Sequence, residues 1–301
     1  MSTIAISFLV FLGIFLGIGV LSSIRKQNTT GDYLVASRSI NPWVAALSAV
    51  ATNNSGFMFV GLIGTTFVEG LSAMWIMIGW VFGDWLMWVW GVPRALRERS
   101  ETTDTVTIPS FLGHGLGKNR SVTIVAGLIT LIFLGTYAAA QLTAGGKALY
   151  AAFGWHEVVG AAIGAGVVLV YCFSGGIRAS IWTDVAQSVV MLVAMAGLCL
   201  FAVNDLGGFG GLWQTLADED PMLVCSTPES TQFGMVLFVA GWFVAGMGVV
   251  GQPHIMIRVM AIRSPEDMKT ARQVYLVWNV LFATAAITVG LAARAALSDA
   301  D

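Results

Sequence analysis

The chain has 301 residues, of which 56% are hydrophobic and only 11% are charged, and its formal net charge at pH 7 is -2. A soluble domain carries about 25% charged residues, so this composition, with a mean hydropathy of +0.79, excludes a water-facing globular surface and predicts a membrane protein. No basic cluster indicates a nucleic-acid partner. The sequence also lacks a nucleophile–base constellation, a phosphate loop and metal-site spacing, so we expect neither an enzyme nor a bound cofactor.

Long apolar runs dominate the chain, and each is near the ~20 residues that cross a bilayer as an α-helix. Alternating apolar and polar residues, which would indicate a membrane β-barrel, do not occur in the sequence. We therefore expect an all-α integral membrane protein, in contact with the lipid bilayer, with about eight transmembrane helices. The expected spans are 4–24, 43–69, 72–91, 121–149, 156–173, 180–203, 233–261 and 274–297.

The distribution of basic residues agrees with these spans. Thirteen of the 15 lysines and arginines fall in segments that would share one side of the membrane, and only Lys147 and Arg294 fall on the other side. Basic residues stay on the cytoplasmic side. We therefore expect a multi-pass protein of the plasma membrane (the inner membrane in bacteria) with its N-terminus outside.

A polar stretch, "ATNNSG", interrupts the second apolar run between Ala51 and Gly56. Asn and Ser side chains compete for backbone hydrogen bonds and Gly56 relaxes the φ/ψ restriction, so we expect the helix to unwind here. Unwinding frees carbonyl oxygens that suit a hard cation such as Na⁺, and it exposes a half-helix N-terminus that suits a carboxylate. The alternative is a continuous helix whose Asn and Ser side chains bond to neighbouring helices.

A second apolar run, 240–260, is interrupted by glycines and by Pro253. Proline removes a backbone donor and clashes with the preceding helical turn. Two interrupted helices, one in each half of an inverted repeat, indicate the binding site of a secondary transporter. The alternative for this run is a proline kink with glycines that allow close packing.

Four stretches between residues 32 and 272 resemble one known family: "DYLVASRSINPWVAALSAVATNNSGF", "SGGIRASIWTDVAQ", "GQPHIMIRVMA" and "KTAR". The chain is similar to the sodium/solute symporter family, and most closely to its sodium/proline symporter branch. The resemblance implies an inverted-repeat core with discontinuous helices. It also implies a secondary active symporter that uses Na⁺ as its coupling ion to import a small organic solute, such as proline, another amino acid or a carboxylate.

The same resemblance implies how the chain is organised. We expect a single membrane domain over 1–301, with an extra N-terminal helix at 4–24, a first five-helix repeat at 43–203 and an incomplete second repeat at 233–297. Family members continue for several more spans, so we expect this chain to be a fragment or a truncated product. We expect a monomer.

The resemblance also assigns ion-binding residues. In the family, backbone carbonyls of the first broken helix hold sodium, and these match Ala51 and Asn54, next to Ser55. The hydroxyl ligands of the family lie on a later helix, beyond this sequence. Arg38 matches an arginine implicated in coupling, and Asp184 matches an aspartate on the sodium exit path.

We expect six positions at the solute site, and three of them depart from the family's pattern. Proline symporters carry an aspartate at the position of Asn53, and a tryptophan and a tyrosine at the positions of Ala245 and Val249. A tryptophan does occur one helical turn earlier, at 242. The solute-site positions are Asn53, Gly56, Trp242, Ala245, Val249 and Pro253.

Asp84 is an acid within the expected span 72–91. An ionisable residue inside a membrane span is a functional candidate, and this one could add the negative charge that Asn53 lacks or bind a proton. The alternative is an acid that bonds to a neighbouring helix or lies near a cavity.

A second function belongs to a different class. Symporter-like domains can be fused to signalling domains, so the chain could instead be a symporter-like membrane sensor module that binds a solute. The departures at Asn53, Ala245 and Val249 are compatible with that role.

Overall fold

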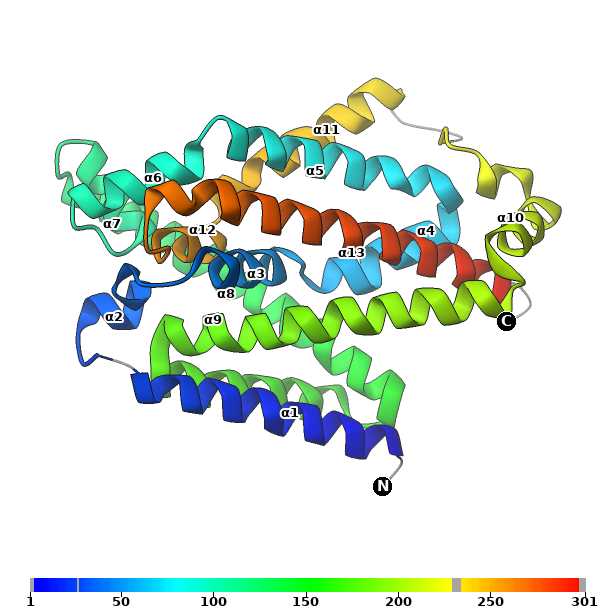
Figure 1. The fold of residues 1–301 in the computed structure, drawn as a ribbon, viewed down its shortest axis with the longest axis horizontal. Helices are drawn as coiled ribbons and strands as arrows, with labels where there is room; N and C mark the ends of the chain where they lie inside the picture. The colour runs from blue at the N-terminus through cyan, green and yellow to red at the C-terminus, as the bar shows by residue number, and fades with distance from the viewer. Residues whose placement is uncertain (1–2, 26, 229–233, 298–301) are drawn as a thin grey trace. The chain divides into compact units, whose positions relative to one another are not determined.

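The computed structural model describes residues 3–25, 27–228 and 234–297, and these residues are helical without forming a strand (Figure 1). Residue 233, where the seventh span was expected to begin, lies outside the described residues. The α-helices are α1 (Thr3–Ser22), α2 (Thr30–Val35), α3 (Pro42–Asn53), α4 (Ile63–Glu69), α5 (Met74–Val89), α6 (Val92–Thr102), α7 (Ile108–Gly115), α8 (Arg120–Phe153), α9 (Glu157–Asp205), α10 (Gly208–Glu219), α11 (Met235–Met247), α12 (Pro253–Met260) and α13 (Met268–Leu297). Short turns join them: 3₁₀ turns η1 (Ser23–Arg25), η2 (Ala36–Arg38), η4 (Gly70–Ala73), η5 (Pro221–Val224), η6 (Gly248–Gly251) and η7 (Pro265–Asp267), and the π-helical turn η3 (Phe57–Leu62).

Five helical stretches among the described residues are long and apolar enough to cross a membrane, or six if α11–η6 and α12 form one span. Two of these stretches contain a non-helical glycine. Gly70 (φ 67°, ψ -147°) separates α4 from α5, and Gly176 (φ 57°, ψ -142°) interrupts α9. If each glycine divides two spans, the described helices account for the eight expected ones.

Gly176 divides a helix that is too long for a single crossing. The 49 residues of α9 would measure about 74 Å as one straight helix, against a hydrocarbon core of about 30 Å. Figure 1 shows that the ribbon of α9 doubles back along its length. A Cβ atom at residue 176 would lie 2.5 Å from the carbonyl oxygen of Tyr33, so both the backbone torsion and the close approach require glycine.

The chain divides into two compact units. Unit 1 comprises Met1–Thr52, Val92–Ser188 and Gln252–Arg272, and unit 2 comprises Asn53–Gly91, Val189–Gly251 and Gln273–Asp301. This division cuts across the five-helix repeats expected from the sequence, and the repeats remain a prediction.

In unit 1, backbone pairing ties the start of α3 to the end of α12. The Ile40 amide donates to the Ala261 carbonyl at 3.0 Å, and the Arg263 amide donates to the Ile40 carbonyl at 2.9 Å. The fully buried Arg97 of α6 donates to the carbonyls of Ile262 at 2.5 Å and Arg263 at 3.2 Å. A buried guanidinium needs such acceptors, so this arginine fixes the pairing.

A second arginine of unit 1 joins α2 to α9. Arg178 forms an ion pair with the buried Asp32 at 2.6 Å and donates to the Ala36 carbonyl at 3.0 Å. Burial alone would raise the pKa of Asp32, but Arg178, the Gln27 amide and the Ser37 hydroxyl stabilise the carboxylate and lower its pKa overall. The α2 turn is therefore held by a charge pair and not only by apolar packing.

In unit 2, α5 and α11 approach closely through glycines. A Cβ atom at Gly83 would lie 1.9 Å from the Phe243 carbonyl oxygen, and one at Gly246 would lie 2.0 Å from the Trp80 carbonyl oxygen. Small residues at helix contacts let backbones approach in membrane proteins. These glycines therefore set the spacing of α5 and α11.

The other part of the unit 2 core joins α10 and η5 to the end of α13. Arg294 forms an ion pair with Glu219 at 2.8 Å, and its guanidinium lies 5.3 Å from the ring centroid of Phe67. The apolar residues of this cluster are Val203, Leu212, Leu216, Leu223, Leu291, Ala292 and Ala295.

The glycine contact predicts a packing defect on substitution. Gly83→Ala should destabilise the protein by about 1–3 kcal/mol, since overpacking forces backbone shifts. We expect a lower thermal unfolding midpoint of the purified protein. Gly241→Ala is the matched control, because a Cβ atom on that α11 glycine meets nothing within 4 Å. Equal midpoints for the two variants would contradict the packing argument.

Candidate ion and solute site

The first expected break is present, and it is short. Helix α3 ends at Asn53, the π-helical turn η3 begins at Phe57, and only Asn54, Ser55 and Gly56 lie between them. Gly56 has φ -53° and ψ -20°, which any residue adopts. The expectation that glycine's extra freedom opens this helix is therefore wrong, and the local hydrogen bonds explain the break instead.

Two backbone amides at this break are redirected. The Ser55 amide donates to the Asn53 carbonyl at 3.0 Å, and the Met58 amide donates to the Ser55 carbonyl at 3.0 Å. In a continuous α-helix the same amides would donate four residues back, to the carbonyls of Ala51 and Asn54. The α-helical hydrogen-bond pattern is thus interrupted next to Ala51 and Asn54, the two residues whose carbonyls the sequence predicted as sodium ligands.

The second break lies between α11 and α12. The 3₁₀ turn η6 follows α11, Gln252 is extended (φ -91°, ψ 108°), and Pro253 begins α12. The first position of a helix has no use for a backbone donor, so the proline is compatible with α12 starting here. The interruption is a true break and not a kinked continuous helix.

In unit 1, Asp184 of α9 is the centre of a hydrogen-bond network. One of its carboxylate oxygens accepts from the Ser48 hydroxyl at 2.6 Å, from the Thr52 hydroxyl at 3.4 Å and from Arg258 Nη2 at 2.8 Å. Arg258 Nε also donates to the Ser48 hydroxyl at 2.8 Å. Since Ser48 and Thr52 lie in the last two turns of α3, Asp184 and Arg258 connect this half-helix to α9 and α12.

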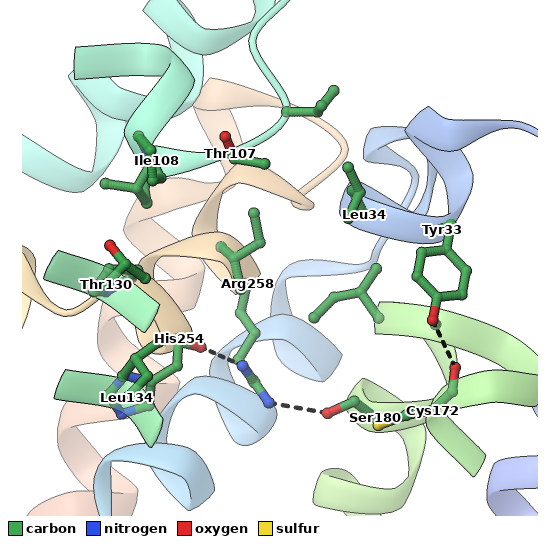
Figure 2. Close-up of a pocket in the computed structure, with 16 residues that line it drawn as sticks. Tyr33, Leu34, Thr107, Ile108, Thr130, Leu134, Cys172, Ser180, His254 and Arg258 are labelled. Carbon is green, nitrogen blue, oxygen red and sulfur yellow. Dashed lines mark hydrogen bonds between the residues drawn. The ribbon is translucent and has the colours of Figure 1, made fainter. Parts of the chain in front are cut away.

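Arg258 is the functional candidate that the sequence analysis missed. It was counted only as a cytoplasmic basic residue, but its side chain is 8% exposed and pairs with Asp184. Figure 2 shows its guanidinium donating to the Ser180 hydroxyl and to the His254 carbonyl. The available signal was an arginine only five residues after the helix-breaking proline, within an apolar run.

A cavity of about 530 Å³ lies beside this network in unit 1 (Figure 2). Its walls are mostly apolar, and its polar groups include the side chains of Arg258, His254 and Ser180. Both ring nitrogens of His254 are buried without a hydrogen-bond partner among the described residues, and its ring packs 5.1 Å from that of Tyr137. Pro253 also lines the cavity.

Arg38 takes part in a different set of contacts. Its Nη2 donates to the carbonyls of Ser100 and Thr105, each at 2.8 Å. Burial and the neighbouring Arg97 lower the pKa of Arg38 below its ordinary value. Among the described residues, the hydrogen bonds of Arg38 go to Ser100 and Thr105, and those of Asp184 go to Ser48, Thr52 and Arg258. The residues matched to coupling and to ion exit therefore belong to separate networks.

In unit 2, a tyrosine joins Asn53 to the intramembrane acid. The Asn53 amide donates to the Tyr275 hydroxyl at 2.7 Å. Asp84 faces the same Tyr275 and the indole of Trp88, and the rings of Trp88 and Tyr275 lie 5.2 Å apart. Tyr275 lies 222 residues from Asn53 in the sequence, and no local pattern indicated this contact.

The remaining predicted solute-site positions of unit 2 lie on α11 and η6. The Trp242 ring stacks on Phe57, the first residue of η3, with centroids 6.1 Å apart, and lies 6.3 Å from Trp80. Ala245 is half-buried, and Val249 is 0% exposed. An aromatic face thus lies next to the first break, supplied by Trp242.

These features define a class of protein. The chain is all-helical, several of its helices are long enough to span a membrane, and two are broken where polar groups gather. Broken membrane helices of this kind occur in secondary transporters, in which they line the binding site.

Comparison with known proteins identifies the family. The profile of the "Sodium:solute symporter family" matches residues 33–300. The chain therefore belongs to the sodium:solute symporter family, as the motifs predicted, and it is a multi-pass membrane protein.

The relatives with similar sequences are named as proline transporters. The chain is 33% identical over 275 residues to the high-affinity proline transporter PutP of Bacillus subtilis (strain 168), covering 91% of this chain and 57% of that protein. It is 34% identical over 296 residues to sodium/proline symporter 2 of Staphylococcus saprophyticus, covering 98% of this chain and 57% of that protein. The chain thus spans little more than half the length of these relatives, which are transporters and not enzymes.

A solved structure with the same fold is a Na⁺-coupled sialic acid symporter in a substrate-bound, outward-open state. The TM-score is 0.82 at 18% identity, over 97% of this chain and 60% of that chain. At this identity the comparison shows the fold alone, and it confirms the predicted all-α symporter fold.

The Asp184–Arg258 pair predicts a large effect of removing one partner. Arg258→Met should destabilise the protein by about 3–5 kcal/mol, because it removes the counter-charge of the Asp184 carboxylate, which is only 14% exposed. The double variant Arg258→Met/Asp184→Asn should recover most of that loss. Chemical unfolding of the purified protein measures both.

Arg263→Met is the matched control for this pair. Its guanidinium bonds Asp267 at 2.6 Å, but it is 55% exposed, so its loss should change the unfolding free energy little. If Arg258→Met proves no more destabilising than Arg263→Met, Asp184 does not depend on Arg258.

Proposed function

We propose that the complete protein is a sodium-coupled secondary active symporter of the plasma membrane, the inner membrane in a bacterium, with its N-terminus outside. Its partners are Na⁺ and a small organic solute such as proline, another amino acid or a carboxylate. It needs no cofactor beyond the coupling ion, and it functions as a monomer.

The redirected amides at the first break carry this proposal. The Ser55 amide donates to Asn53 and the Met58 amide to Ser55, so the backbone leaves the regular α-helical pattern next to the carbonyls of Ala51 and Asn54. Oxygen ligands suit a hard monovalent cation, and backbone carbonyls of an unwound helix supply them without a buried charge. We assign Ala51, Asn54 and Ser55 to the sodium site on this basis.

The solute would bind next to the same break. A half-helix N-terminus attracts a carboxylate, and the ring of Trp242 on Phe57 offers an apolar face. The names of the relatives support proline as the first solute to test, whereas the residues at positions 53, 245 and 249 favour testing others as well. The assigned solute positions are Asn53, Gly56, Trp242, Ala245, Val249 and Pro253.

Coupling would use the electrical and chemical gradients of sodium. One charge that moves across 100 mV supplies about 2.3 kcal/mol, which supports a solute gradient. Asp184 is assigned to the ion exit path, where it meets Ser48 and Arg258, and Arg38 is assigned to coupling. The two relatives described above are named as a transporter and a symporter, which supports transport over the sensor interpretation.

The experiment is uptake of labelled solutes into sealed vesicles that contain the full-length gene product carrying this chain. An inward Na⁺ gradient should drive saturable uptake of proline or of another small solute, and an equal K⁺ gradient should not. Equal uptake in both gradients for every solute would refute sodium coupling.

Two substitutions at one position test the carbonyl ligands. Asn54→Ala keeps the backbone carbonyl and should change the half-saturating Na⁺ concentration by no more than about threefold, within the spread of a modest local effect. Asn54→Pro pushes Asn53 out of the α-region and should abolish Na⁺-driven uptake, as measured in the same vesicles. Normal uptake by the proline variant would exclude carbonyl ligation at this break.

A further inference from the structure

Asp84 is a buried acid without a counter-charge. Its side chain is 0% exposed, and both carboxylate oxygens are buried without a hydrogen-bond partner among the described residues. None of the ion pairs formed by the described residues includes it. The other buried acid of the described chain, Asp32, has both an arginine and hydrogen bonds.

The polar groups that face Asp84 are few. From α13 it meets the Tyr275 hydroxyl, and from its own helix it meets the indole of Trp88, which also lacks a hydrogen-bond partner. Behind Tyr275 lies the Asn53 amide. Tyr275 is the only titratable side chain in this described set, and it is neutral near pH 7. No cation from these elements therefore neutralises Asp84.

An isolated carboxylate in a low-dielectric interior is costly by many kcal/mol. Only two states relieve that cost: the acid binds a proton, or it binds another small cation. The two donors that face Asp84, the Tyr275 hydroxyl and the Trp88 indole, are neutral, so they do not compensate the charge of an ionised carboxylate. The uncompensated charge of Asp84 therefore points to a proton or another small cation as its ligand.

Asn53 is the last residue of α3, at the first break, and contributes a neutral amide that cannot neutralise a cation. The structure joins Asn53 to Tyr275 and Tyr275 to Asp84 within unit 2. Tyr275 thus connects this break to a carboxylate on a different helix.

We propose that Asp84 supplies the negative charge of a monovalent-cation site at the first break, for Na⁺ or H⁺, and that Tyr275 links it to Asn53. The Tyr275 oxygen accepts from the Asn53 amide, so its own proton is available to Asp84. This inference rests on the proposed cation-coupled function, but it assigns residues that the family pattern does not supply.

The test is a charge exchange in the full-length protein. Asp84→Asn removes the negative charge at nearly constant side-chain volume. The double variant Asn53→Asp/Asp84→Asn restores one carboxylate, now at position 53, on the other side of Tyr275. Two responses are measured on purified protein: the rise in the thermal midpoint with added NaCl, against KCl at equal ionic strength, and the midpoint as a function of pH. A ligand that binds only the folded state raises this midpoint.

Asp84→Asn should raise the half-saturating Na⁺ concentration at least about tenfold, or flatten the pH response, because a charge a few ångströms from the cation is lost. The exchanged double variant should restore the wild-type response to within about threefold. Glu69→Gln is the matched control, because Glu69 is an exposed acid of the same unit at the end of α4. It should leave both responses unchanged.

Which response changes identifies the cation. A change in the Na⁺ response at fixed pH indicates Na⁺, and a change confined to the pH response indicates a proton. The inference is overturned if folded Asp84→Asn behaves as Glu69→Gln does, or if the exchanged variant folds and restores nothing. If Asp84→Asn behaves as Glu69→Gln does, the wild-type protein can still show Na⁺-driven uptake, so the proposed function would not be refuted with it. Wild-type uptake that follows H⁺ alone would instead end the sodium assignment and leave the role of Asp84 standing.

Discussion

Hydrocarbon offers no hydrogen bonds, so each backbone group at membrane depth must find its partner inside the protein or on a ligand. The break at Asn54–Gly56 is the place where this constraint matters most. Helix α3 stops, the amides of Ser55 and Met58 turn to nearer carbonyls, and the chain resumes through a π-helical turn, a geometry that is frequent at functional sites. The proposed cation site uses this interruption, because backbone carbonyls of an interrupted helix can serve as cation ligands.

The same constraint explains why the buried arginines of the protein all have acceptors. Arg97, Arg178 and Arg258 are each buried or nearly so, and each has an anion or backbone carbonyls to donate to. A guanidinium has five donors in a fixed plane, which suits it to joining several segments at once. Asp84 departs from this rule, since its oxygens have no partner in the described structure. Against a background in which charges are paired, one unpaired acid beside a helix break is informative.

The sequence alone predicted an all-helical membrane protein and both breaks, because hydropathy and helix-breaking residues are local signals. It placed Asn54 at the first break and Pro253 at the second, as the structure has them, whereas Ala51 still lies within α3. It could not predict that Ser48 and Arg258 meet Asp184, or that Asn53 meets Tyr275, because these contacts join residues 74 to 222 positions apart. It also misjudged Gly56, because a redirected amide can end a helix without unusual torsions. Asp84 was recognised as unusual from its type and depth, but its neighbours came only from the fold.

The pairing of Ile40 with Ala261 and Arg263 has a mechanical meaning. Two backbone hydrogen bonds join the start of α3 to the end of α12, and Arg97 donates to the adjacent carbonyls. The two helix ends therefore form one rigid unit. If one half-helix tilts, the other must tilt with it, because separating them would leave the Ile40 and Arg263 amides without their hydrogen-bond acceptors. Any rearrangement of these two helix ends would therefore be cooperative, with both ends moving together.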